Sequence, residues 1–160
     1  MTGFLDAYYR LLKILLTGLM GLLIVPVSLQ VLSRYTGLIP RWIWTEEVAR
    51  FCFMWIIMIG AMIAVRDSTH FDVDVLPKPK TARGEAWSRL LVHGFMLLVA
   101  IVFVRYGWDY ALFGWQQESE LTGINMLWIH AAYPLAGVTW VAFLTEKMAA
   151  AVAILRGRSA

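Results

Sequence analysis

Hydrophobic residues fall in four long stretches along the chain, and charged residues separate them. With histidine counted as neutral, Ile14–Ser33 and Met126–Thr145 each run for 20 residues without a charge. Phe51–Val65 and Leu90–Val104 each run for 15. A helix needs about 20 apolar residues to cross roughly 30 Å of hydrocarbon. The two longer stretches meet this rule, and the shorter two meet it if the arginine at one end of each reaches the interface.

These four stretches predict a membrane protein. A chain of 160 residues has too little interior to bury four apolar helices on every side in water. The composition agrees, because 60% of the residues are hydrophobic and only 16% are charged. We therefore expect an all-α, polytopic chain that forms a single membrane domain over residues 1–160. The expected transmembrane helices run from about 12–33, 46–65, 88–110 and 126–149.

The basic residues predict how the chain is oriented. Ten of the 14 Lys and Arg residues lie in the N-terminal segment, the second connection and the C-terminal segment, and four lie on the other side. The positive-inside rule then places both termini in the cytoplasm. Tryptophans and tyrosines near the expected outer ends agree with an interfacial aromatic belt. The net charge of +3 follows from this topology and does not indicate nucleic-acid binding.

No chemistry is evident at the expected mid-membrane level. The centres of the four spans hold no ionisable residue, whereas transport pathways commonly place charged groups there. Paired histidines can ligate haem, but His93 and His130 are expected near opposite membrane faces. The single cysteine, Cys52, allows no intramolecular disulfide. We expect no catalytic, cofactor or metal site in this chain.

Polar residues concentrate instead where the second span begins. Glu46 and Glu47 lie four and three residues before Arg50, and Thr45 is suitable as an N-cap. One interpretation is a capped helix start with a surface ion pair. The other is a contact with a partner protein, which Arg34 favours because it ends the first span at the same level. The candidates for partner contact here are Arg34, Trp44, Glu46, Glu47 and Arg50.

A second polar segment follows the second span. If it is extended, His70, Asp72 and Asp74 share one face. A metal site is conceivable, but acidic residues in such a place more often cap a helix or pair with nearby Lys and Arg. We expect no metal and treat the three residues as further candidates for partner contact.

The chain resembles the small membrane subunit of tripartite ATP-independent periplasmic (TRAP) transporters over nearly its whole length. The order and spacing of several short motifs around the second span carry the resemblance. They are Arg34-Tyr35, Trp44-Thr45-Glu46-Glu47-x-x-Arg50, Phe53-x-Trp55, Gly60-Ala61, Arg66 and His70-Phe71-x-Val73-Asp74.

The resemblance implies a subunit of the bacterial inner membrane, without enzymatic activity, that pairs with a large permease. It also implies a periplasmic substrate-binding protein, uptake of an organic acid such as a dicarboxylate by sodium symport, and sodium sites on the large permease. Two alternatives stay open at this point. One is a four-helix anchor or electron-transfer subunit of an oxidoreductase, and the other is a small drug or ion carrier that works as a homodimer.

Overall fold

The computed structural model describes residues 3–36, 40, 42–67, 82–120 and 122–155, and these ranges are almost entirely helical. Four helices are long and apolar enough to cross a membrane, which confirms the all-α, four-span prediction. His70, Asp72 and Asp74, predicted as contact candidates, lie outside the described residues. The helices are α1 (Gly3–Thr36), α2 (Trp44–Asp67), α3 (Ala82–Trp115), α4 (Leu127–His130) and α5 (Ala132–Leu155).

The helices are longer than the expected spans. At 1.5 Å per residue, the 34 residues of α1 and of α3 each extend for about 51 Å, well beyond the roughly 30 Å of a hydrocarbon core. A helix of this length must tilt or project from the bilayer. The hydropathy pattern therefore locates the apolar part of each helix but not its ends.

The fourth span consists of α4 and α5, with a short break at Ala131. Pro134 lies in the first turn of α5 and has no backbone N–H to donate to the carbonyl of His130. Neighbouring helical bonds persist, since Ala131 N donates to Leu127 O at 2.8 Å and Leu135 N donates to Ala131 O at 3.3 Å. Despite the break, α4 and α5 together therefore form one candidate membrane span, Leu127–Ala153.

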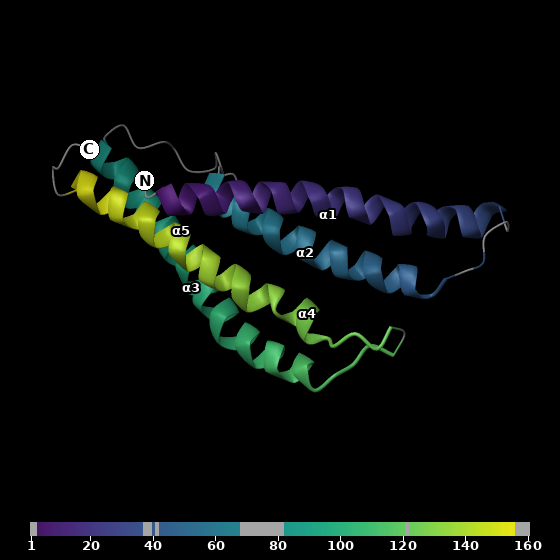
Figure 1. The fold of residues 1–160 in the computed structure, drawn as a ribbon. Coiled ribbons are helices and arrows are strands. Elements are labelled where there is room, and N and C mark those ends of the chain that lie inside the picture. The colour runs from purple at the N-terminus through teal and green to yellow at the C-terminus, as the bar shows by residue number, and fades with distance from the viewer. Residues whose placement is uncertain (1–2, 37–39, 41, 68–81, 121, 156–160) are drawn as a thin grey trace.

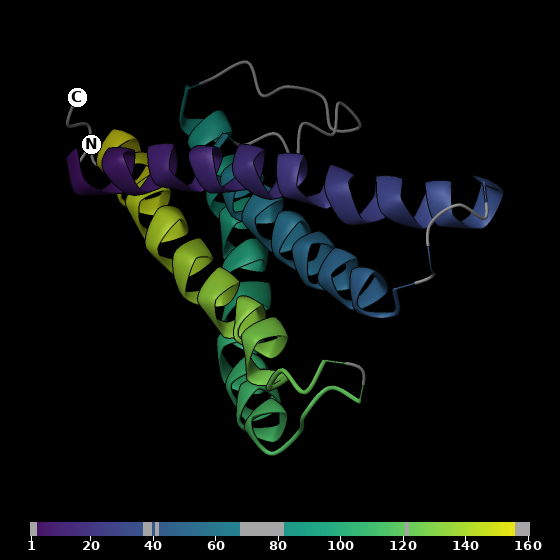
Figure 2. The same ribbon diagram turned by 45° about the vertical axis from the view of Figure 1, so that its right-hand side comes forward.

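Two helical pairs form the molecule, and they diverge. α1 packs along α2, and α3 packs along α5 (Figure 1). The first turn of α1 and the last turns of α2 and α5 lie together, at what we call the terminal end. From there the two pairs separate toward the far end, which holds the α1–α2 and α3–α4 connections (Figure 2).

Small residues let α3 and α5 approach closely. A Cβ atom built on Gly137 would come within 2.8 Å of the Val104 nitrogen, and one built on Gly107 within 2.9 Å of the Pro134 nitrogen. Ala136, between these contacts, is fully buried. Lipid tails are as apolar as the side chains, so close packing of this kind, rather than escape from water, favours the association of membrane helices.

The buried side chains gather toward the terminal end, where α2 and α5 meet. Met62, Phe143 and Leu144 are at most 1% exposed, and Leu12 of α1 joins the same cluster. Tyr8 also packs there, because its ring lies 6.1 Å from that of Phe143 and its hydroxyl lies 2.9 Å from Thr139 Oγ1. The three helices α1, α2 and α5 thus share one core at this end.

Candidate functional site

The polar group predicted at the start of α2 lies at the far end of the molecule. Helix α2 begins at Trp44, and the hydroxyl of Thr45 donates to the carbonyl of Trp42 at 2.7 Å. The prediction of Thr45 as an N-cap is therefore wrong, because its hydroxyl closes the preceding turn instead. The rings of Trp42 and Trp44 are stacked with their centroids 6.1 Å apart, and both are 45% exposed.

The two glutamates of this group have different surroundings. Glu46 contacts Arg50 at 3.5 Å, and their side chains are 68% and 61% exposed. Exposed pairs of this kind contribute only ~0.2–1 kcal/mol in water. Glu47 is only 6% exposed, and neither a pair with Arg50 nor any hydrogen bond to its buried Oε2 occurs within the described ranges. The structure therefore shows the expected Glu46–Arg50 pair but not the expected Glu47–Arg50 pair.

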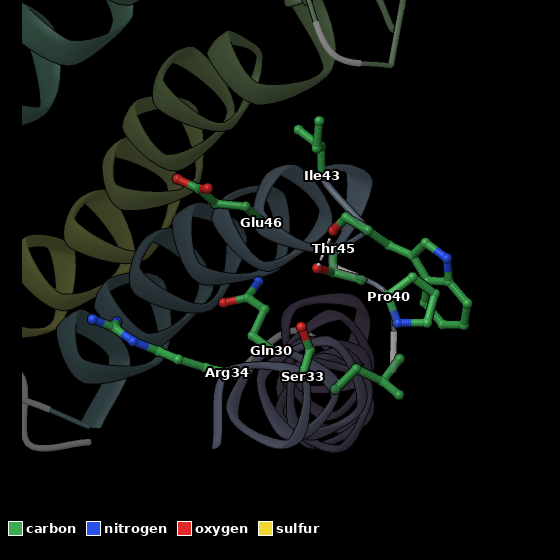
Figure 3. A pocket seen from close by; sticks show the side chains of 9 residues that line it. Gln30, Ser33, Arg34, Pro40, Ile43, Thr45 and Glu46 are labelled. Atoms are coloured by element: carbon green, nitrogen blue, oxygen red, sulfur yellow. Dashed lines mark hydrogen bonds between the residues drawn. The ribbon is translucent and has the colours of Figure 1, made fainter. Parts of the chain in front are cut away.

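A pocket of about 390 Å³ lies between the far ends of α1 and α2 (Figure 3). It brings together two of the predicted candidates, Arg34 from α1 and Glu46 from α2, whereas Trp44, Glu47 and Arg50 do not line it. The residues that line the pocket and carry polar side-chain groups are Gln30, Ser33, Arg34, Trp42, Thr45 and Glu46. Gln30 was not predicted from the sequence, because a single uncharged amide inside a long apolar stretch forms no motif or charge pattern.

A second polar cluster, also missed from the sequence, lies at the terminal end. The guanidinium of Arg66, at the end of α2, donates to Glu146 of α5 at 2.9 Å and to Asp6 of α1. Its side chain is only 8% exposed. The guanidinium carbon also lies 5.0 Å from the ring centroid of Phe143 and 5.6 Å from that of Tyr9. One cation therefore joins three helices.

Other groups extend this terminal cluster. Tyr9 donates its hydroxyl to Asp67, and the ammonium of Lys13 lies 4.3 Å from the centroid of the Tyr9 ring. Lys147 of α5 donates to the backbone carbonyl of Val65 at 2.7 Å. With Arg66, Asp6 and Glu146, the cluster contains three cations and three carboxylates, so the formal charges balance.

The acidic members of the terminal cluster could have been predicted from their positions in the sequence. Asp6 and Glu146 are isolated carboxylates near the ends of very apolar helices that the topology places on one side of the membrane. A carboxylate there is expected to find a cation, and Arg66 lies at the same level. Arg66 contributes to the topology count and to the family motif in the sequence, but the pattern alone does not show which carboxylates it contacts.

The two histidines of the described ranges, His93 and His130, lie near opposite ends of α3. His130 on α4 is 4% exposed, and its Nδ1 lies 3.1 Å from the Tyr110 carbonyl while its ring stacks on that of Tyr110 at 3.9 Å. His93 lies in the first half of α3, toward the terminal end. Within the described ranges, no three His, Cys, Asp or Glu side chains are grouped as a metal site would require.

Four apolar helices of spanning length define a multi-pass membrane protein, and comparison with known proteins identifies its class. Residues 23–153 match the family described as "Tripartite ATP-independent periplasmic transporters, DctQ component". The chain therefore belongs to this family of small TRAP permease subunits. It is a component of a transporter and not an enzyme, so the oxidoreductase alternative is set aside.

Individual relatives agree with this assignment. The chain is 26% identical over 159 residues to the sialic acid TRAP transporter small permease protein SiaQ of Vibrio cholerae, which covers 94% of this chain and 91% of that protein. It is 29% identical to the sialic acid TRAP transporter permease protein SiaT of Haemophilus influenzae, over 68% of this chain but only 18% of SiaT. It is 30% identical to the isethionate TRAP transporter permease protein DctMQ of Oleidesulfovibrio alaskensis, over 46% and 12% of the two chains.

The geometry of the terminal cluster predicts a large loss of stability when its cation is removed. Arg66→Gln leaves Asp6 and Glu146 without their shared partner, and breaking a buried ion pair costs ~3–5 kcal/mol. Because Asp6 is 37% exposed, we expect a loss near ~3 kcal/mol, at the lower end of that range. The measurement is the free energy of unfolding of the purified chain in detergent micelles.

Arg50→Gln is the matched control, because it removes an arginine from an exposed pair with Glu46. This change should cost less than about 1 kcal/mol. If Arg66→Gln and Arg50→Gln destabilise the chain equally, the terminal cluster does not hold the three helices together.

Proposed function

We propose that this chain is the small membrane subunit that supports a large TRAP permease during sodium-coupled, binding-protein-dependent uptake of an organic acid. The match of residues 23–153 to the small-subunit family carries the proposal. The similarity to 18% of SiaT adds support, because a segment like this chain there forms part of a much longer permease. A close association between small and large subunits is consistent with such an arrangement.

The distribution of charge explains why a partner is needed. Ion pairs of the described ranges lie around Arg66, between Glu46 and Arg50, and between Arg105 and Asp109, and the sequence places no ionisable residue at the expected centre of any span. A sodium-coupled carrier needs an ion site near the middle of the bilayer. We therefore assign the sodium sites and the substrate pathway to the large permease, and we assign substrate delivery to a periplasmic binding protein.

Reconstitution tests this division of labour. Liposomes that contain only this chain should show no sodium-driven uptake above empty liposomes, because the chain offers no coupling site. Liposomes that also contain the cognate large permease and binding protein should accumulate one member of a labelled panel that includes sialic acid, isethionate and succinate. Uptake by this chain alone would contradict the supporting role, whereas no uptake by the large permease without it would strengthen that role.

The proposed orientation places both termini and the terminal cluster in the cytoplasm of a bacterial inner membrane. The ten-to-four distribution of basic residues supports it. The far end, with Glu46 and the 116–120 segment that follows α3, then faces the periplasm, where a binding protein can approach.

Reporter fusions test the orientation. Alkaline phosphatase fused after Glu118 should be active, because the enzyme folds only in the periplasm, and the same enzyme fused after Lys80 should be inactive. Green fluorescent protein at the C-terminus should fluoresce. The reverse pattern of phosphatase activity would overturn the orientation.

Partner contact is proposed for the exposed members of the polar group at the far end. Trp44, Glu46 and Arg50 are 45%, 68% and 61% exposed, and Arg34 and Glu46 also line a pocket between this chain's own helices. Glu47 stays a candidate, but its carboxylate is buried against its own chain. Trp and Arg are the residue types most enriched among the dominant contacts of protein interfaces. His70, Asp72 and Asp74 are proposed as a second contact on the cytoplasmic side.

A matched pair of substitutions tests the contact through Arg50. Arg50→Ala should reduce co-purification of the large permease by about tenfold or more, because a hydrogen bond to a charged group is worth ~1.5–3 kcal/mol. Arg105→Ala is the control, since Arg105 also forms an exposed i,i+4 pair, with Asp109 on α3. Equal recovery of the large permease with both variants would mean that Arg50 forms only a surface ion pair and does not contact the large permease.

A further inference from the structure

The pocket between the far ends of α1 and α2 has the size and the lining of a small-molecule site. Its volume of about 390 Å³ lies within the ~300–1,000 Å³ that ligand pockets usually occupy. Both helices and the connection between them contribute to its wall. The pocket lies at the end of two membrane-spanning helices, beside the stacked rings of Trp42 and Trp44. Such amphipathic rings prefer the depth of lipid headgroups.

Among the residues that line the pocket, Gln30 has a buried side-chain atom that lacks a hydrogen-bond partner in the described ranges. This atom is the amide nitrogen Nε2. A buried N–H₂ group normally finds an acceptor, so an acceptor is missing from the pocket. Figure 3 shows the carboxamide of Gln30 extending from α1 on the same side as the Arg34 and Glu46 side chains.

Charges of opposite sign flank this amide. Arg34 supplies a guanidinium from α1, with donors arranged to bind a phosphate or a carboxylate. Glu46 supplies a carboxylate from α2, and its 3.5 Å contact with Arg50 is long enough to leave acceptor capacity for another cation. A ligand that satisfies all three side chains must carry an anionic group with free oxygens and a cationic group with N–H donors.

We infer that this pocket binds the headgroup of a zwitterionic aminophospholipid such as phosphatidylethanolamine. The lipid phosphate accepts hydrogen bonds from Arg34 and Gln30, and the primary ammonium donates to Glu46. Leu29, which lines the pocket more than one turn deeper along α1 than Arg34, lies beside the apolar part of the lipid below the headgroup. Phosphatidylglycerol lacks the cation, and phosphatidylcholine has a cation without N–H donors, so both satisfy the pocket less completely.

Native mass spectrometry of the purified chain tests the assignment. The chain in detergent micelles is offered equal amounts of phosphatidylethanolamine, phosphatidylglycerol and phosphatidylcholine with identical acyl chains. We expect phosphatidylethanolamine adducts to exceed each of the others by about tenfold, because one further hydrogen bond to a charged group separates the ligands. Equal retention of the three lipids by the wild-type chain would overturn the inference.

Variants assign the headgroup to the pocket. Arg34→Gln and Gln30→Leu should lower phosphatidylethanolamine adducts to the level of phosphatidylcholine, and Glu46→Gln should remove the preference over phosphatidylglycerol. Arg105→Gln, which changes an exposed arginine on α3, should leave the preference intact. Circular dichroism checks that each variant keeps its helical content. If the three pocket variants behave like Arg105→Gln, the lipid binds elsewhere and the inference fails.

A soluble competitor separates a lipid from a free zwitterion. Glycerophosphoethanolamine carries the same phosphodiester and ammonium without acyl chains, and at millimolar concentration it should not displace the bound lipid. If it removes the phosphatidylethanolamine adducts and binds in their place, the occupant is a soluble zwitterion and the assignment to a lipid is wrong.

Discussion

A guanidinium that is 8% exposed near the end of an apolar helix must be neutralised by its own protein, because hydrocarbon cannot solvate it. In this chain Arg66 is neutralised by carboxylates from two other helices, Asp6 and Glu146. The requirement of one charge therefore fixes the relative positions of α1, α2 and α5. Apolar packing has no comparable directionality in a bilayer, since helix surfaces contact lipid as readily as each other.

The two ends of the molecule consequently differ in how their polar groups are satisfied. At the terminal end, charges of opposite sign from three helices balance within the chain, and Lys147 also binds a backbone carbonyl. At the far end, Glu46 and Arg50 form only an exposed pair, and the Gln30 amide lacks an acceptor in the described ranges. The far end is therefore where a lipid or another subunit has most to add.

The sequence predicted the all-α class and the number of spans, because an uncharged stretch of 15 to 20 residues has few alternatives to a membrane span. It also placed Arg34 and Glu46 at one level, which the shared pocket confirms. It did not predict the partners of Arg66, since Asp6, Glu146 and Arg66 meet only after three helices pack. The close approach at Gly107 and Gly137 was equally hidden, because a glycine's neighbours depend on helix rotation.

The divergence of the two helical pairs gives the terminal cluster a mechanical consequence. Arg66 joins the two pairs at the terminal end, and the indole of Trp55 on α2 also donates to the Trp128 carbonyl of α4 at 3.0 Å. If this second contact opens, a force on either far end turns that pair about a pivot at the terminal end. For a helix that spans ~30 Å, a rotation of ~10° about the end at Arg66 moves its other end by about 5 Å. Side chains at the pivot would keep their contacts almost unchanged during such a rotation. A large permease that changes shape beside this subunit could thus move the far end of either pair without breaking the ion pairs of Arg66.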